Sequence, residues 1–364
     1  MKFIPPKAFL KKVQRVPHAP GTREGLELMD RNERTLDFPP EVMSELRQRI
    51  TPFLLRAYPE PEPLYRKLEQ WLKVPRERLL LTLAADGGLH SVFETFVQPG
   101  DEVVCITPSY AMVPVYCGIS DAVCQEVSFG GDLSLPLERI LERIHDRTKL
   151  VLLANPNQPI ERVYTDQEMQ ILLAECLRYN ALLVMDEAYH HFCPMTAAPW
   201  VAEYGNLIVV RSFSKAFGIA GVRLGYLLSQ PENIQNLNKV RPMYETHSLA
   251  IAIGLYLLEH PDLMESYVRQ VQQSVAAVTS TLRRLGIQAF GQWTNCVIVG
   301  LPEDLPAPKL QEALRGQGFL IRAETAAPLT NHLRITVGPL EQTLRFLKAF
   351  ESILSDAKSH SVTH

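Results

Sequence analysis

The chain has 364 residues, 46% of them hydrophobic, which is enough for a large core and for two domains. Its formal net charge is −3 and no block of basic residues occurs, so nucleic acid is excluded as an expected partner. Two lysines and two prolines within the first seven residues interrupt any apolar run there. We therefore expect no signal peptide, no membrane association and a cytoplasmic location.

The six cysteines are scattered and include no C-x-x-C pair. Most lie among apolar neighbours, where a free cysteine behaves as a small hydrophobic residue. His190 and His191 are adjacent and lack metal-ligand spacing. We therefore expect six reduced, structural thiols and no metal site.

Four parts are expected along the chain. Residues 1–40 should form an N-terminal arm and part of a small domain, and residues 41–245 a large cofactor-binding domain. Residues 246–356 should form a small C-terminal domain, and residues 357–364 a flexible tail. Within the first part, residues 28–34 resemble a short strand.

The large domain alternates apolar runs with helical periods. Strands are predicted at 79–83, 102–106, 122–127, 149–153, 181–185, 207–211 and 224–228. Helices are predicted at 41–50, 62–73, 84–97, 135–145 and 165–178. This alternation is typical of an α/β fold with a mainly parallel sheet and helices on both faces.

The C-terminal part changes pattern and predicts a smaller α+β domain. Helices are predicted at 246–258, 262–285 and 340–354, with polar residues from 355 onward expected to fray. Strands are predicted at 295–299, 319–322 and 333–337.

Lys215 is preceded by Ser212 and Ser214 and followed, eight residues on, by Arg223. Hydroxyls and a guanidinium are groups that hold a phosphate. A desolvated lysine beside cations has a lowered pKa and becomes nucleophilic. This pattern predicts a lysine that condenses with the aldehyde of pyridoxal phosphate while its neighbours hold the phosphate.

Asp186 ends the apolar run 182–185, and Tyr189 follows three residues later. An aspartate at the end of a buried strand can sit under a pyridine nitrogen and keep it protonated. Tyr189 can then reach the ring hydroxyl. Together with Lys215, these residues form the predicted catalytic set.

These motifs resemble fold-type-I pyridoxal-phosphate enzymes, and residues 28–350 are similar to the histidinol-phosphate aminotransferase branch of the class I/II aminotransferases. The resemblance implies a seven-stranded-type sheet in an aspartate-aminotransferase-like large domain. It also implies that Ala85 and Asp86 bind the cofactor phosphate and that Tyr110 stacks on its ring. Tyr58 is expected to reach the partner subunit's cofactor, which implies a homodimer.

Two arginines lie in the predicted C-terminal strands. An arginine in an apolar strand is costly unless it meets an anion. By resemblance, Arg334 binds a substrate carboxylate or phosphate, Arg322 is a second phosphate-holding position, and Asn32 lies near the substrate.

Three positions depart from the family pattern. Gln158 stands where relatives carry the asparagine that donates to the ring hydroxyl, and Glu161 stands where they carry glycine. Relatives usually have proline in place of Arg34. Gln158 is still expected to contact the cofactor, although its reach differs by one methylene.

The leading hypothesis is an aminotransferase that uses a small amino donor, an amino acid or an amine bearing phosphate or phosphonate, and an oxo-acid acceptor. A second hypothesis keeps the cofactor but has the enzyme act as a decarboxylase or as an eliminating and cyclising lyase. A third is a catalytically silent binding protein.

Overall fold

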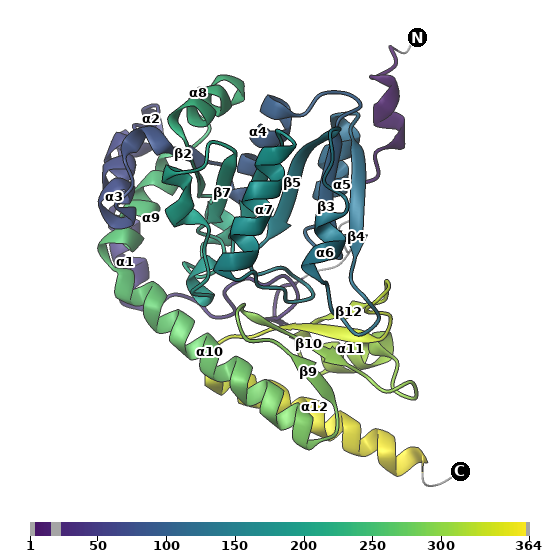
Figure 1. The fold of residues 1–364 in the computed structure, drawn as a ribbon. Helices are drawn as coiled ribbons and strands as arrows, with labels where there is room; N and C mark the ends of the chain where they lie inside the picture. Colours follow the sequence, from purple (N-terminus) through teal and green to yellow (C-terminus); the bar gives the residue numbers. More distant parts are fainter. Residues whose placement is uncertain (1–3, 16–22, 362–364) are drawn as a thin grey trace.

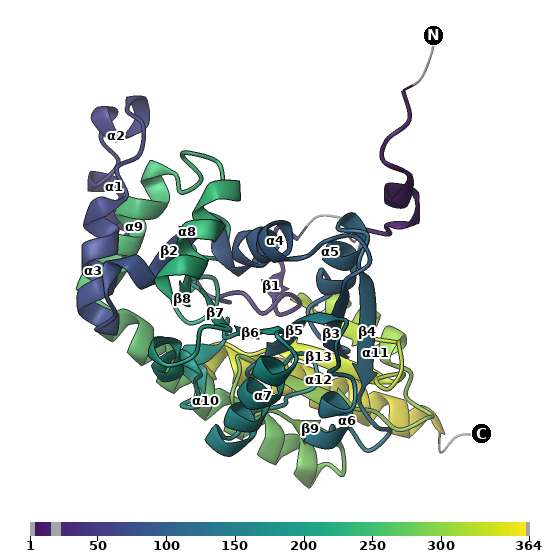
Figure 2. The ribbon, with the colours of Figure 1, turned by 45° about the horizontal axis from the view of Figure 1, so that its top comes forward.

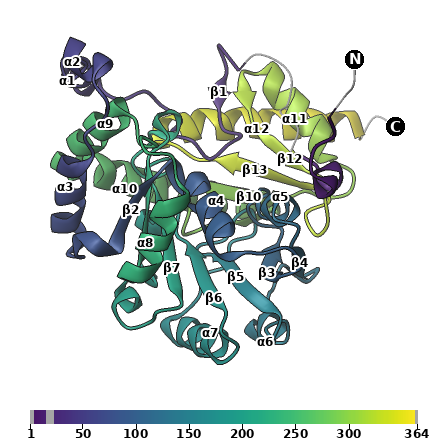
Figure 3. The same ribbon diagram turned by 90° about the horizontal axis from the view of Figure 1, so that it is seen from above.

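The computed structural model describes residues 4–15 and 23–361. A large sheet forms its centre, and a smaller sheet lies at one end beside α12 (Leu340–Ser361) (Figures 1 and 3). Within the described ranges, no helix is long and apolar enough to cross a membrane.

The large sheet has seven strands and is mainly parallel, which confirms the predicted fold class. Only β8 runs antiparallel to its neighbours β2 and β7 among the described strands. The strand order is β2 (Leu79–Thr82), β8 (Gly225–Ser229), β7 (Leu207–Ser212), β6 (Leu182–Asp186), β5 (Thr148–Ala154), β3 (Glu102–Thr107) and β4 (Val123–Ser128).

Helices cover both faces of this sheet because most of its strands are apolar on both sides. Apolar side chains of α4 (Ala84–Phe96), α5 (Val113–Ile119) and α8 (Pro231–Val240) pack on one face. On the other face lie α6 (Leu137–Leu141), α7 (Asp166–Arg178) and α3 (Glu62–Leu72). Each fully buried leucine or valine in these layers contributes roughly 1.5–3 kcal/mol by leaving water.

A group of helices extends from the β2 edge of the sheet (Figure 2). It contains α1 (Pro40–Gln48), α2 (Pro52–Arg56), α3 and α9 (Ser248–Glu259). Although α9 follows the predicted domain boundary at residue 245, it packs against α3. The division into domains stays a prediction.

The smaller sheet is antiparallel in the order β12 (Arg322–Glu324), β13 (His332–Thr336), β10 (Cys296–Gly300) and β9 (Gln288–Phe290). The long helix α10 (Pro261–Arg284) leads to it, and α11 (Ala307–Gly316) and α12 pack nearby (Figure 1). A two-stranded parallel pair joins β1 (Glu27–Leu28) to β11 (Phe319–Leu320). The N-terminal segment is thereby attached to the smaller sheet's part of the molecule.

Several predicted boundaries were wrong. The strand-like piece at 28–34 is only β1, because Asn32 adopts a left-handed φ of 55° and turns the chain. The predicted helix at 135–145 shortens to α6. In contrast, α12 continues through residues 355–361, which were expected to fray, and residues 362–364 lie outside the described ranges.

Five further elements were missed. Three of them, α2, α5 and β9, are too short to show a clear period, whereas α8 and α11 are ten-residue amphipathic helices that the sequence analysis overlooked. The 3₁₀ turns were missed as well, because three to five residues carry too little periodicity to be recognised. They are Ala8–Lys12, Arg76–Arg78, His190–Phe192, Ala198–Ala202 and Ala220–Val222.

Candidate active site

Most of the predicted cofactor-binding residues lie at or near the carboxyl edge of the large sheet. Asp186 is the last residue of β6 and Ser212 the last of β7, and these strands pair in parallel. Ligands of open α/β sheets bind at this edge. Gly225 lets the start of α4 approach it, because a Cβ there would lie 2.5 Å from the carbonyl carbon of Ala84 and 2.7 Å from the oxygen of Arg211.

Lys215 lies in the loop after β7. Its Nζ donates to the carbonyl oxygen of Asn32 at 3.0 Å and lies 5.6 Å from the centre of the Tyr189 ring. Burial, followed by the charge of Arg334, lowers the pKa of the Lys215 amine to about 8. A substantial fraction of the amine is therefore neutral near physiological pH, as nucleophilic attack or proton abstraction requires.

Asp186 is 7% exposed, and its Oδ1 accepts the backbone N–H of Ala188 at 3.0 Å. Burial raises the pKa of this carboxyl to about 6. No cation lies within ion-pair distance of it among the described residues. A buried carboxylate of this kind is stabilised by a positively charged partner.

A hydrogen bond joins Asn32, in the turn after β1, to Tyr189, in the loop after β6. The Nδ2 of Asn32 donates to the Tyr189 hydroxyl at 2.8 Å, and the Asn32 backbone N–H donates to Oγ1 of Thr336 at 2.8 Å. Asn295 donates from Nδ2 to the Asn32 carbonyl at 3.1 Å. These bonds hold the turn at Asn32 against β13 and direct its side chain toward Tyr189.

The predicted phosphate-binding groups come from two segments. At the first, α4 begins with Ala84 in a left-handed φ of 57°, followed by Ala85 and Asp86. At the second, Oγ of Ser212 donates to Oγ of Ser214 at 2.9 Å. A helix start presents free N–H groups to an anion.

Arg223 and Tyr110 complete this region. Nη1 of Arg223 lies 3.5 Å from Oγ of Ser214, and the left-handed φ of 57° at Arg223 sets its direction. The Tyr110 hydroxyl donates to Oδ1 of Asp86 at 2.8 Å, and the Tyr116 hydroxyl donates to the same oxygen. Tyr116 was not predicted, since its position in an unrecognised short helix hid it.

Gln158 contacts the smaller sheet. Its Nε2 donates to Oγ1 of Thr294 at 2.8 Å, and the Cys296 thiol donates to its Oε1 at 2.7 Å. Glu161 is similarly engaged, because its Oε2 accepts the backbone N–H of Trp293 at 2.8 Å. Both departures from the family pattern therefore bind the segment 292–296.

Arg334 and Arg322 are direct partners in the register of β13 and β12. Both approach Oε1 of Glu324, with Nε at 3.5 Å for Arg334 and 3.2 Å for Arg322. The Arg334 side chain is 16% exposed and that of Arg322 is 52% exposed. The charge of Arg334 contributes to the lowered pKa of the Lys215 amine, and the Arg322 side chain is the more exposed of the two.

Tyr58 lies apart from these residues in the single chain. Its side chain is 74% exposed and stacks on Tyr244 with ring centres 4.2 Å apart. Its predicted contact with a partner subunit's cofactor requires a dimer, so the single chain does not test it.

Sequence reasoning missed several residues of the site. Cys296 was interpreted as a structural thiol, yet it is 1% exposed and bonds Gln158. The polar run Thr294-Asn295-Cys296 before a strand was a usable signal, since buried polar groups there need partners. Thr336 and Glu324 were also missed.

A cluster outside the site contains Cys105, Cys124 and Glu126, whose ligand atoms all lie within 4.8 Å of one another. All six cysteines are free thiols. The expectation of no metal site remains a prediction.

The side chains present fit pyridoxal phosphate. Asp186 is a buried carboxylate that a protonated ring nitrogen would neutralise, and Lys215 is an amine of lowered pKa for the aldehyde. Ser212, Ser214, Arg223 and the start of α4 are the groups that could hold the phosphate. These groups define the class of a pyridoxal-phosphate-dependent transferase.

Comparisons with known proteins agree. The family model for aminotransferase class I and II matches residues 6–350. The chain is 32% identical to a histidinol-phosphate aminotransferase of Caldanaerobacter subterraneus, over 90% of this chain and 93% of the relative. It is 30% identical to histidinol-phosphate aminotransferase 1 of Nitrosococcus oceani, over 79% of this chain and 78% of the relative.

Solved structures show the same fold. A histidinol-phosphate aminotransferase from Sinorhizobium meliloti in complex with pyridoxal-5'-phosphate aligns with a TM-score of 0.83 at 23% identity, covering 97% of this chain and 99% of that one. An aspartate aminotransferase from Thermus thermophilus with maleate aligns with a TM-score of 0.77 at 20% identity, covering 96% and 98%. The chain belongs to the aminotransferase class I and II family. It is an aminotransferase whose cofactor is pyridoxal phosphate, as the sequence predicted.

Proposed function

We propose that this enzyme moves an amino group between an amine bearing a phosphate or carboxylate, of the histidinol phosphate type, and a 2-oxo acid. The observation that carries this substrate class is the pairing of Arg334 with Arg322 across β12 and β13. Two adjacent guanidiniums can bind an anionic group with charge-assisted hydrogen bonds. The names of the relatives, histidinol-phosphate aminotransferases, support the same class.

The proposed roles follow from the geometry. The bound cofactor supplies an electron sink for the bond-breaking at the substrate carbon. Lys215 Nζ removes the proton from that carbon and, with the cofactor bound, would deliver it to the cofactor's aldehyde carbon, and its lowered pKa of about 8 suits both transfers. With the cofactor bound, Asp186 would keep the ring nitrogen protonated, and Tyr189, oriented by Asn32, would donate to the ring hydroxyl.

A donor panel tests the substrate class. Histidinol phosphate, aminoethylphosphonate, phosphothreonine, aromatic amino acids and arginine derivatives are each incubated with 2-oxoglutarate, and glutamate is measured. We expect Arg334→Gln to lower kcat/KM for the best donor by about 10²-fold or more, since losing a partner of a buried anion costs roughly 2–5 kcal/mol. Arg322→Gln should cost less because it is half exposed.

The exposed Arg66 on α3 provides the matched control, since Arg66→Gln removes the same charge away from the site. Equal activity of Arg334→Gln and Arg66→Gln toward every anionic donor would contradict the proposed substrate class.

Lys215 is tested without turnover. Borohydride reduction of the cofactor-loaded protein should leave cofactor mass on the peptide that contains Lys215, and Lys215→Ala should leave none. Labelling of a different lysine in the wild-type protein would remove Lys215 from its role.

A decarboxylating or eliminating reaction is the second candidate. The observation that favours it is the engagement of the Gln158 amide with Thr294 and Cys296, which leaves it less free for the ring hydroxyl. The donor panel separates the two reactions, because only amino transfer produces glutamate from 2-oxoglutarate.

We also propose a homodimer in which Tyr58 reaches the partner's cofactor phosphate. Large apolar side chains are exposed around Tyr58, including Leu55 at 66% and Met243 at 80%. Such a patch is typical of an interface. A cytoplasmic location remains part of the proposal, where the free thiols would stay reduced.

A further inference from the structure

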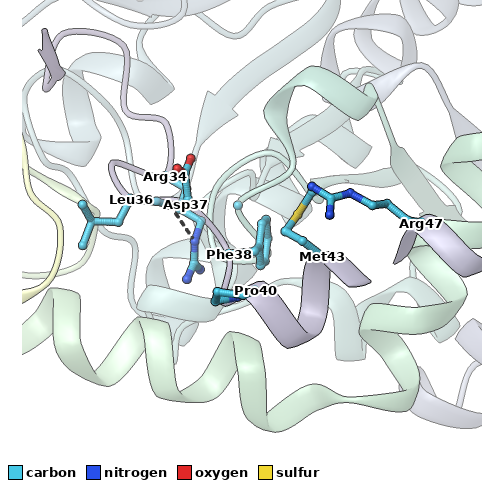
Figure 4. A pocket seen from close by; sticks show the side chains of 8 residues that line it. Arg34, Leu36, Asp37, Phe38, Pro40, Met43 and Arg47 are labelled. Atoms are coloured by element: carbon cyan, nitrogen blue, oxygen red, sulfur yellow. Dashed lines mark hydrogen bonds between the residues drawn. The ribbon is translucent and has the colours of Figure 1, made fainter. Parts of the chain in front are cut away.

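A pocket outside the candidate active site lies beside the Lys215 loop. Its lining contains none of the residues assigned to cofactor or substrate. Its volume is about 700 Å³, within the range of small-molecule sites. It is lined by Arg34, Leu36, Asp37, Phe38, Pro40, Met43, Arg47 and Gly218 (Figure 4).

Arg34 is the unusual residue of this pocket. Its guanidinium is stacked between two rings, with its carbon 4.4 Å from the centre of Phe38 and 4.3 Å from that of Tyr267. Nε donates to the carbonyl oxygen of Leu36 at 3.1 Å. Burial lowers the pKa of the guanidinium, so its charge is incompletely hydrated.

The stacking accounts for both faces of the Arg34 guanidinium but not for its edge. Nη1 and Nη2 make no hydrogen bond or ion pair with any described residue. A half-buried guanidinium with unused donors is stabilised by an anion that accepts from its fork. Asp37 is not that anion, because no ion pair joins its carboxylate to Arg34 and the carboxylate points away from the guanidinium in Figure 4.

A second cation faces the same space. Arg47 extends from α1 past Met43 toward the ring of Phe38 (Figure 4), and it forms no ion pair with a described residue. The rest of the lining is largely apolar, with Leu36, Pro40 and Met43. Two guanidiniums beside an apolar wall suit a ligand that combines an anionic group with a carbon skeleton.

We propose that Arg34 and Arg47 form a binding site for a small organic anion, a phosphate ester or a carboxylate, distinct from the cofactor and substrate sites. Gly218 connects this pocket to the Lys215 loop, since a Cβ at Gly218 would lie 2.7 Å from Cδ of Arg34. Asn32, which bonds the Tyr189 hydroxyl, is two residues from Arg34. An anion here therefore contacts the segment that carries a residue of the active site.

Titration calorimetry of the cofactor-loaded protein tests this site with three probes: inorganic phosphate, phenyl phosphate and benzoate. We expect saturable binding of at least one probe, and tighter binding of phenyl phosphate than of inorganic phosphate if the apolar wall contributes. Comparing phenyl phosphate with benzoate distinguishes a phosphate site from a carboxylate site.

Arg34→Met, which keeps an unbranched side chain without charge, should weaken the binding by at least tenfold. Arg47→Gln should weaken it severalfold and provides an independent test, because this exposed residue can change without disturbing the core. Arg66→Gln should bind the probe as the wild type does. Arg334→Gln should lose only the probe that binds at the substrate site and should keep the binding that Arg34→Met removes.

Three results would overturn the proposal: no saturable binding of any probe, unchanged binding in both Arg34→Met and Arg47→Gln, or loss of binding only in Arg334→Gln. The last result would assign the anion to the substrate site. Circular dichroism and retained cofactor absorbance confirm that each variant is folded and loaded.

Discussion

At the scale of single residues, Asp186 shows how a site built for a charged cofactor destabilises the protein without it. Burial raises the pKa of this carboxyl from an ordinary 3.8 to about 6. A group with a raised pKa in the folded state stabilises the fold fully below its unfolded pKa, and this contribution is lost as the pH rises through the folded value. Deprotonated Asp186 therefore costs roughly 3 kcal/mol above pH ~6 in the absence of a cationic partner.

We predict that Asp186→Asn raises the free energy of unfolding of the cofactor-free protein by about 1–3 kcal/mol at pH 8 and leaves it unchanged below pH ~4. Urea unfolding at the two pH values measures this difference. Asp304→Asn, at an exposed loop position, is the control and should show no such pH dependence. A gain of the same size at both pH values would show that burial of the charge is not the cause.

Gln158 was predicted to contact the cofactor, but in the structure its amide bonds residues of the smaller sheet's segment. Its amide joins Thr294 and Cys296, both buried, to the loop after β5. The extra methylene relative to asparagine supplies the reach for these two bonds.

We predict that Gln158→Asn lowers the free energy of unfolding by about 1–2 kcal/mol, because the shorter amide leaves buried polar groups unpaired. Denaturant unfolding measures the loss, and Gln98→Asn at an exposed position is the control. Unchanged stability combined with tighter cofactor binding would instead assign the Gln158 side chain to the cofactor.

At the scale of elements, the site depends on the close approach of α4 to β7 and β8. Gly225 pairs with Thr82 on β2 and with Ser212 on β7. The carboxyl edge is further fixed by a buried ion pair, in which Nε of Arg211 donates to Oε2 of Glu187 at 3.0 Å. The phosphate-binding groups therefore hold their positions through backbone contacts that tolerate no added atom at Gly225.

We predict that Gly225→Ala destabilises the protein by about 3 kcal/mol or more, since the new Cβ would meet backbone atoms that cannot move aside. Thermal and urea unfolding provide the measurement. Gly221→Ala is the matched control, because a Cβ there has nothing within 4 Å, and its effect should stay within about 1 kcal/mol. Similar stability of the two variants would mean that the strands can separate to admit the methyl group.

At the scale of the whole molecule, the exposed apolar side chains near α2 form a patch that is typical of an interface. Phe53 is 56% exposed, Leu55 66% and Met243 80%, and the stacked rings of Tyr58 and Tyr244 lie among the same segments. If this surface is the dimer interface, assembly also completes the active site through Tyr58.

We predict that Leu55→Glu or Met243→Glu shifts the protein from dimer to monomer and lowers activity at the same time, because a buried unpaired charge opposes association. Light scattering after gel filtration measures the assembly. Leu177→Glu is the control, since this leucine on α7 is 58% exposed elsewhere on the molecule. Dimers that persist in both interface variants would place the interface on a different face.

The sequence by itself was sufficient for the α/β class, for the positions of the large sheet's strands along the chain and for the family. Buried strands such as β7 are long uniform apolar runs, and Lys215 with its serines is a local pattern. Local patterns predict local structure because propensity and hydrophobic period act over neighbouring residues.

Only the tertiary structure decided which distant residues meet. The bonds from Asn32 to Tyr189, from Gln158 to Cys296, and the stacking of Arg34 on Tyr267 join residues separated by more than a hundred positions. Side-chain partners of this kind follow from the packing of the two sheets and α10, which no local period specifies. The contacts made by Arg34 and Gln158, two of the positions that depart from the family pattern, were therefore visible only in the folded molecule.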